Sequence, residues 1–131
     1  IYKECFIMPQ GILLIKWDNE VGPVGIVIHP DLKNPKQSSH ADLFIARYAS
    51  TKPGFSSLVL KNLKIVSFYS GRGEKFIEVE DHVIAIVLRR DEDINKYREI
   101  LNKIASEVLS NIENQGYKKI IPKLYQDLSK I

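Results

Sequence analysis

The sequence is poor in cysteine and in long hydrophobic runs. Cys5 is the only cysteine among 131 residues, so the chain forms no internal disulfide and offers no cysteine-based zinc site. Its longest uninterrupted apolar run is six residues, at 83–88, far below the roughly 20 that an α-helix needs to span a bilayer. The first residues (IYKECFIMPQ) lack the small-residue cleavage site of a secretory signal peptide. These absences favour a cytoplasmic protein.

Motifs of catalysis are also missing. The glycines and lysine at 71–75 (GRGEK) lack the spacing of a phosphate-binding loop and favour a hairpin turn. No G-x-S-x-G elbow occurs, and the histidines show no metal-ligand spacing. The acidic run at 78–81 (EVED) fits either a turn or half of a cation site whose other oxygen ligands lie elsewhere. We therefore expect no enzyme, no cofactor and no metal centre.

The positive charge is concentrated at one end of the chain. The net charge is +3, and residues 117–131 carry the whole excess. This segment is either the solvated face of a short helix or a contact for an acidic partner or an anionic membrane surface. It lacks the interleaved basic and aromatic residues of a nucleic-acid site, so no nucleic-acid partner is expected. The lysines concerned are Lys118, Lys119, Lys123 and Lys130.

The first half of the chain predicts a hairpin followed by a helix. Residues 11–17 and 24–29 are apolar at nearly every position, as in strands covered on both faces. The link at 18–23 (DNEVGP) contains turn-forming residues, and the pattern of strand, short link and strand predicts an antiparallel hairpin. A polar loop is expected at 30–38, and a capped amphipathic helix at 39–50.

The middle of the chain predicts further strands. Residues 57–60, 63–70, 76–79 and 82–89 are rich in apolar and β-branched residues and are separated by turn signals. The last two segments are compatible with one bent strand or with two paired strands. Three or four strands are therefore expected in this block.

The C-terminal third predicts two helices. Apolar residues at 94–112 recur with the period of an amphipathic helix about 20 residues long. The acidic residues 91–93 precede it, favoured there by the helix dipole, and the last of them is a natural N-cap. Gly116 is expected as the C′ residue that ends this helix. A short helix is then expected at 121–131, with Pro122 in its first turn.

Together these elements predict a single domain over residues 1–131, with 1–9 as an N-terminal extension and 117–131 as a basic C-terminal helix. The fold class is α+β. We expect a three-layer α/β/α sandwich with a mostly antiparallel five-stranded sheet. One helix would cover one face of the sheet and two would cover the other, because the strands are apolar on both faces.

This order of elements resembles the longin domain, within the group of longin, roadblock and profilin-like domains. Residues 11–24 (GILLIKWDNEVGPV) look like the first hairpin of archaeal longin-like or roadblock-like proteins, and 68–71 (FYSG) also look like that group. Roadblock domains usually carry an additional helix before the first strand, for which residues 1–10 are too short. The longin form is therefore the closer resemblance.

The resemblance implies a non-enzymatic protein-interaction module that forms homodimers or heterodimers. It would serve as a platform for a small GTPase, or for a complex that regulates GTPases or vesicle trafficking. There are two alternatives. One is a membrane-surface adaptor, which would make peripheral membrane contact. The other is a small-ligand sensor with a pocket under the 30–38 loop. The expected partner-binding residues lie on the hairpin and the first helix: Trp17, Asp18, Glu20, Pro23, Phe44, Arg47 and Tyr48.

Overall fold

Five strands and two helices make up the described part of the molecule. The computed structural model describes residues 11–29, 53–59, 63–71, 79, 81–89 and 91–128. The strands are β1 (Gly11–Asp18), β2 (Gly22–His29), β3 (Gly54–Val59), β4 (Leu63–Tyr69) and β5 (His82–Arg89), followed by the 3₁₀ turn η1 (Ile94–Tyr97) and the helices α4 (Arg98–Leu109) and α5 (Tyr117–Leu128).

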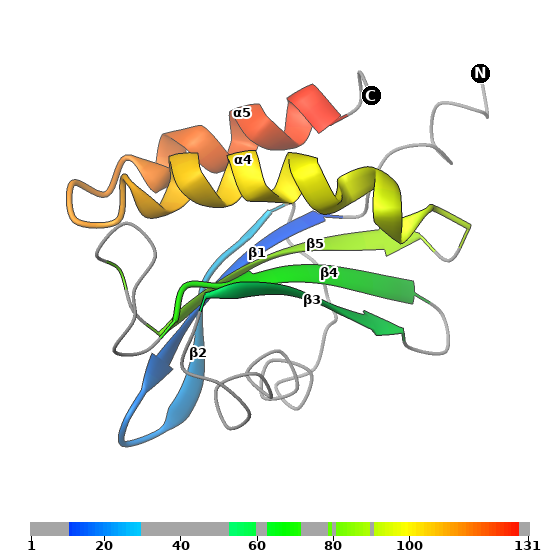
Figure 1. Ribbon diagram of the computed structural model, residues 1–131. Coiled ribbons are helices and arrows are strands. Elements are labelled where there is room, and N and C mark those ends of the chain that lie inside the picture. The colour runs from blue at the N-terminus through cyan, green and yellow to red at the C-terminus, as the bar shows by residue number, and fades with distance from the viewer. Residues whose placement is uncertain are drawn as a thin grey trace.

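The strands form one sheet in the order β2-β1-β5-β4-β3 (Figure 1). All four pairings are antiparallel. The predicted α+β class with a five-stranded antiparallel sheet is therefore confirmed. Strand β5 matches the segment predicted at 82–89, whereas β3 begins at Gly54, three residues before the predicted start.

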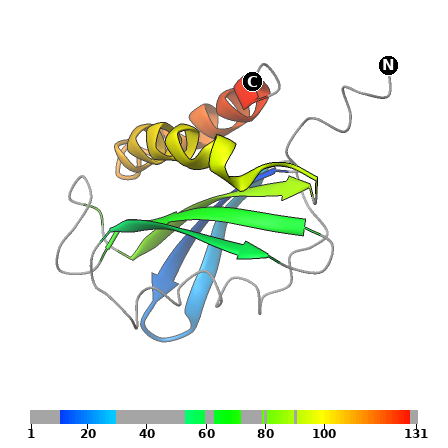
Figure 2. The ribbon, with the colours of Figure 1, turned by 45° about the vertical axis from the view of Figure 1, so that its right-hand side comes forward.

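Both helices pack on the same face of the sheet (Figures 1 and 2). Helix α4 lies over β4 and β5, and α5 lies over β1 and β2. Apolar side chains from every second strand position meet the inner faces of the two helices, as strand and helix periodicity require. The fully buried centre of this layer comprises Ile12, Leu14, Val66, Ile84, Ile86, Leu88, Leu101, Ala105, Val108 and Ile121.

The alternate strand positions form a second buried cluster on the other face of the sheet. It contains Leu13, Ile15, Ile65, Tyr69, Val83, Ala85 and Val87, with Trp17 and Leu58 at its margin. The strands β1, β4 and β5 are thus buried on both faces, which explains why their sequences run apolar without alternation. The helix expected at 39–50 lies outside the described residues, as do all but Val79 of the strand expected at 76–79.

The predicted single helix over 94–112 is wrong in extent. The chain makes a 3₁₀ turn first, and α4 ends at Leu109. Ser110 Oγ donates to the carbonyl oxygen of Ser106 at 2.6 Å, and Asn111 Nδ2 donates to that of Glu107 at 2.8 Å. The Ser106 carbonyl still accepts from the backbone N–H of Ser110 at 3.2 Å, whereas the backbone N–H of Asn111 donates to Val108 at 3.0 Å and leaves the Glu107 carbonyl to the Asn111 side chain. The α-helical hydrogen-bond pattern therefore ends here although the apolar pattern continues.

The expected roles of Gly116 and Pro122 are also wrong. Gln115, at φ 59°, takes the left-handed conformation that Gly116 was expected to supply. Gly116 instead makes a close approach: a Cβ there would lie 2.9 Å from Asn114 Oδ1, the end of an exposed side chain. Its carbonyl oxygen accepts from the N–H of Ile120 at 3.1 Å, so α5 starts at Tyr117. Pro122 therefore lies inside α5, where it removes a single helical hydrogen bond while the apolar stripe continues.

Glu92 joins the sheet to the helical layer. Its buried carboxylate accepts from the N–H of Arg89 at 2.6 Å and from the hydroxyl of Tyr97 at 2.8 Å. Lys64 Nζ donates to the Glu92 carbonyl oxygen at 3.0 Å.

Asp93 is an N-cap as expected, although it caps η1: its Oδ1 accepts from the N–H of Asn95 at 3.0 Å. Glu92 has a different role from the one expected, since its carboxylate is held by the strand end and a tyrosine.

This junction predicts alkaline sensitivity. Burial raises the pKa of Tyr97 above its ordinary value of 10.0, and the hydrogen bond to Glu92 and its negative charge raise it further. Below pH 10 both folded and unfolded states hold the phenolic proton. Above it the unfolded chain releases the proton first, so the free energy of unfolding falls as pH rises toward the folded pKa.

We expect Tyr97→Phe to lower stability near neutral pH, by about 1–3 kcal/mol, because a buried carboxylate loses a donor. Its further loss of stability between about pH 9 and pH 11 should be smaller than that of the unaltered protein. Urea unfolding at several pH values checks both. Parallel loss in the two proteins above pH 10 would show that Tyr97 does not carry the alkaline sensitivity.

Candidate interaction surfaces

The hairpin of β1 and β2 projects beyond the rest of the sheet (Figure 1). Asp18 pairs with Gly22, which leaves a three-residue loop at 19–21, shorter than the link predicted at 18–23. Asp18 Oδ1 accepts from the N–H groups of Glu20 at 2.8 Å and Val21 at 3.3 Å. Gly22 has φ +88°, the left-handed conformation that closes a three-residue hairpin loop. Asp18 therefore has a structural role in the turn.

Trp17 is anchored at the base of this hairpin. Its backbone N–H donates to the carbonyl oxygen of Asp81 at 2.8 Å. Its half-buried side chain packs against the buried cluster on the face of the sheet opposite the helices. Pro23 lies opposite Trp17 in β2 and is also half-buried. Glu20 is exposed at the tip. Of the four hairpin residues expected to bind a partner, only Glu20 is therefore fully exposed.

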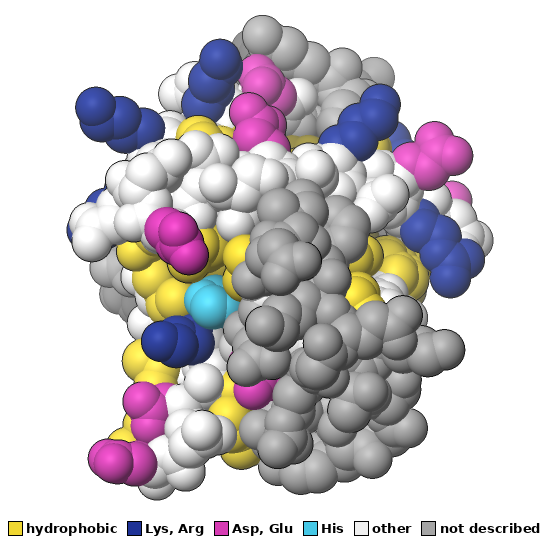
Figure 3. Space-filling model, turned by 60° about the vertical axis from the view of Figure 1, so that its left-hand side comes forward, with side chains coloured by type: hydrophobic (Ala, Val, Ile, Leu, Met, Phe, Trp, Pro, Cys, Tyr) yellow, Lys and Arg dark blue, Asp and Glu magenta, His cyan; other side chains and the backbone are white. Residues whose placement is uncertain are grey.

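Two exposed valines at the tip were not predicted. Val21 is 72% exposed and Val24 is 39% exposed. Figure 3 shows acidic and hydrophobic side chains gathered at the lower end of the molecule, where the hairpin tip lies. The signal in the sequence was Val21 itself, an apolar residue inside a run of turn formers. We call Val21, Val24 and Glu20 the hairpin-tip surface.

A corner of the chain at Asp81 supports the hairpin. Asp81 has φ 57°, an uncommon conformation for a residue with a side chain. Three hydrogen bonds hold it: its N–H donates to the Gly71 carbonyl oxygen at 2.8 Å, Tyr69 donates to its Oδ1 at 2.7 Å, and its carbonyl oxygen accepts from Trp17. The C-terminal end of the acidic run at 78–81 is therefore a turn residue. No three His, Cys, Asp or Glu side chains among the described residues are grouped closely enough to hold a metal ion.

Ser70, Asp81 and His82 form a hydrogen-bonded corner at the start of β5. Ser70 is fully buried, and its Oγ accepts from the backbone N–H of His82 at 2.9 Å. The Asp81 carboxylate accepts from the hydroxyl of Tyr69 at 2.7 Å. A nucleophilic serine must reach a substrate and donate to its base. This arrangement builds a β-turn corner and offers no such path.

The two edges formed by the described strands differ in how well they are suited to strand addition. On β2, Pro23 supplies no N–H, and the pairing shifts between Leu14 and Ile15 so that β2 bulges. Proline and bulges are devices that block strand addition. On β3 the sequence GFSSLV has no charge and no proline, and its register with β4 is unbroken. No described strand lies on its outer side, and Val59 is 65% exposed.

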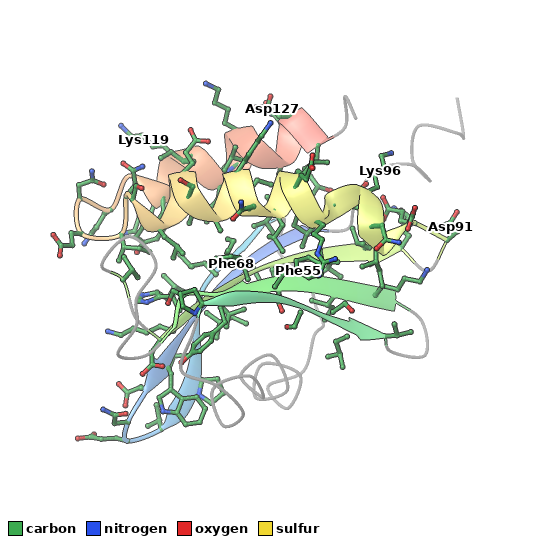
Figure 4. All side chains as sticks on the ribbon, in the orientation of Figure 1. Phe55, Phe68, Asp91, Lys96, Lys119 and Asp127 are labelled. Atoms are coloured by element: carbon green, nitrogen blue, oxygen red, sulfur yellow. The ribbon has the colours of Figure 1, made fainter. Side chains whose placement is uncertain are left out.

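The helical layer offers a basic helix and an apolar groove. Lys118, Lys119 and Lys123 are exposed on α5, and Lys118 Nζ donates to Gln115 Oε1 at 3.1 Å. Figure 4 shows Lys119 projecting from the outer side of this layer. A groove of about 300 Å³ between the helices is lined by Ile100, Ile104, Leu124 and Leu128, with Lys103, Glu107 and Asp127 around it.

Four of the expected contact residues lie outside the described residues. They are Phe44, Arg47 and Tyr48 of the first predicted helix, and Lys130. The loop expected at 30–38 lies outside them as well. Among the described helices, none is long and apolar enough to cross a membrane. The surfaces that can be described are thus the hairpin tip, the β3 edge and the outer side of α4 and α5.

Comparison with protein-family models, with curated proteins and with solved structures gave no match.

The turn at Asp18 provides a test that separates folding from contact. We expect Asp18→Ala to lower the free energy of unfolding by about 1 kcal/mol, because two turn N–H groups lose their acceptor. Asp18→Asn keeps an acceptor oxygen in the same place and should change stability by less than about 0.5 kcal/mol. Urea unfolding measures both variants. Equal destabilisation by the two would show that the negative charge, not the turn hydrogen bonds, is what matters.

Proposed function

We propose that this chain is a non-enzymatic, longin-like protein-interaction domain. In this proposal it pairs with a second copy or with another longin-like or roadblock-like protein, and serves as a platform for a small GTPase or a GTPase-regulating or trafficking complex. The order of the described elements and the burial of both sheet faces support it. A helix from 39–50 over the second face would complete the three-layer sandwich.

The observation that carries the proposal is the open edge at β3. An exposed edge strand without charge, proline or bulge is a template for pairing with another strand. Proline and a bulge on β2, and the lack of both on β3, favour pairing through β3. Because every pairing in this sheet is antiparallel, an antiparallel pair of β3 strands would extend it without a change of pattern.

The side chains of β3 favour a register centred on Ser57. Opposite residues in an antiparallel pair point to the same face, so Ser57 would face its own copy and Val59 would face Phe55 of the partner. Phe55 already packs against the helix-face core. Val59, two positions from Ser57, would then lose its exposure against an aromatic ring. This pairing covers the large hydrophobic residue that β3 leaves in water.

The hairpin-tip surface is the proposed contact for the GTPase. It projects away from the rest of the sheet and combines exposed apolar side chains with an acidic residue. It lies at the opposite edge from β3, so pairing at β3 leaves it accessible. One domain can therefore pair and bind a second partner at the same time.

Val59→Lys tests the pairing. We expect it to weaken self-association by at least about tenfold, because a buried apolar contact is replaced by a charge. Val21→Lys is the matched control, since it places the same charge at a similarly exposed valine of the hairpin tip. Sedimentation equilibrium measures the association constant of each. A protein that stays monomeric at the highest soluble concentration, or equal weakening by the two variants, would contradict pairing through β3.

The same two variants, with their roles exchanged, test the GTPase contact. Each is immobilised and exposed to lysate of the source organism with GDP or with a non-hydrolysable GTP analogue, and bound GTPases are identified by mass spectrometry. We expect the unaltered protein and Val59→Lys to retain a small GTPase, and Val21→Lys to lose it. Retention that ignores the nucleotide and the Val21 substitution would argue against the hairpin tip as this contact.

A further inference from the structure

Helix α5 separates its side chains sharply by kind. Tyr117, Ile121 and Leu128 are buried against the sheet. The opposite side carries Lys119 and Lys123, which are one turn apart and so lie on the same face of the helix. Lys118 is exposed beside them. Together the three residues Lys118, Lys119 and Lys123 form a surface that we call the lysine face.

The charges of the described elements are unevenly placed. Three lysines and Asp127 give α5 a net charge of +2. On α4, basic and acidic residues cancel, because Arg98 and Lys103 are balanced by Glu99 and Glu107. The hairpin at 16–21 is acidic, with Lys16 against Asp18 and Glu20. It points away from the helical layer, so among the described residues the basic helix and the acidic hairpin lie on opposite sides (Figures 1 and 2).

We propose that the lysine face of α5 contacts an anionic lipid bilayer and turns the hairpin tip away from it. A uniformly charged surface attracts the basic end of the domain and repels the acidic end, so the charge separation selects one orientation. The orientation rests on the proposed function in one respect: a hairpin tip directed away from the lipid remains accessible to the GTPase. The lipid contact itself does not depend on that function.

A bilayer fits the lysine face better than a nucleic acid does. All three cations are lysines, which act as mobile point charges, whereas specific phosphate recognition favours the fork of arginine. Single-stranded nucleic acid also requires exposed aromatic side chains for stacking. In α5 the tyrosines are Tyr117, which is buried, and Tyr125, which packs half-buried against the core. The outer side of the helix therefore offers charge without a stacking platform.

We expect the lysine face to bind an anionic membrane with modest affinity. Each lysine close to an anionic membrane contributes about 1 kcal/mol, or about fivefold in partitioning. Three lysines together contribute about a hundredfold over a neutral membrane at low ionic strength. Such a contact reinforces and orients a domain that is held near the membrane by a partner. It does not anchor an isolated copy firmly.

Two matched double variants test the lipid contact. Lys119→Gln with Lys123→Gln removes two charges from the lysine face. Lys16→Gln with Lys96→Gln removes two exposed charges elsewhere, so both proteins have the same net charge. Co-sedimentation with vesicles of phosphatidylcholine and phosphatidylserine, compared with phosphatidylcholine alone, gives each partition coefficient. We expect the first pair to weaken binding to the anionic vesicles by about 25-fold and the second by less than about threefold.

The single tryptophan reports the orientation. Trp17 lies at the base of the hairpin and is the only tryptophan in the chain. Nitroxide-labelled lipid in the anionic vesicles should leave its fluorescence nearly unchanged while the protein is bound. Strong quenching would overturn the orientation.

Other outcomes would overturn the lipid contact. They are equal binding to neutral vesicles, equal weakening by the two double variants, or tighter binding to single-stranded RNA than to anionic vesicles under the same salt conditions. Loss of pairing through β3 would change none of these measurements, because they use the lysine face and the tryptophan alone. A failure of the proposed function is thereby distinguished from a failure of this inference.

Discussion

The whole structure depends on three strands that are apolar on both sides. In β1, β4 and β5, alternate residues enter two separate buried clusters, and neither face of the sheet can be left in water. Burial of such side chains contributes about 1.5–3 kcal/mol each, which is large compared with the net stability of a domain. Helices α4 and α5 cover one face, and their inner stripes are apolar for that reason. Among the described residues, the charged side chains consequently lie near the strand ends, in the turns and along the helical segment.

Hydrogen bonds at the two ends of β5 fix the orientation of elements that the hydrophobic core does not orient by itself. Glu92 binds the end of β5 and the first turn of the helical segment with one carboxylate, which sets where the chain leaves the sheet. Asp81 makes the corresponding connection at the other end of β5, where its backbone and carboxylate join Gly71, Tyr69 and Trp17. Hydrogen bonds are directional, whereas hydrophobic contact is not. These two acidic residues therefore orient elements that the core alone would only hold together.

The sequence predicted the positions of elements that follow from local periodicity. It did not predict helix ends that depend on the hydrogen bonds of individual side chains. The strands at 11–17 and 82–89 were found because continuous apolar runs of that length leave few alternatives. The end of α4 was missed because the backbone N–H of Asn111 donates to Val108 while its side-chain amide takes the Glu107 carbonyl one turn back. Periodicity carries no information about such bonds, and Ile112 continues the apolar pattern past the true end. Gly116 was assigned a left-handed conformation that Gln115 adopts instead.

Among the candidate surfaces, too, some were visible in the sequence and others depend on the fold. The lysine face was visible in the sequence because four lysines are grouped at one end of the chain. The open edge at β3 was not assigned, because edge position is a property of strand order, and strand order follows from pairings between segments far apart in the chain. Trp17 and Asp18 were chosen for contact because they flank a loop. The structure gives both of them structural hydrogen bonds as well, a distinction that residue type alone does not contain.

The asymmetry between the two sheet edges bears on how many copies can assemble. A sheet that is open at both edges adds subunits without limit and grows into a fibre. Here Pro23 and the bulge at Gly25–Ile26 interrupt one of the two edges formed by the described strands. A self-complementary pairing at the remaining edge consumes it in both copies and leaves nothing to extend. In the proposed pairing through β3, the assembly would therefore close at two copies, because Pro23 and the bulge interrupt the other edge of the described strands.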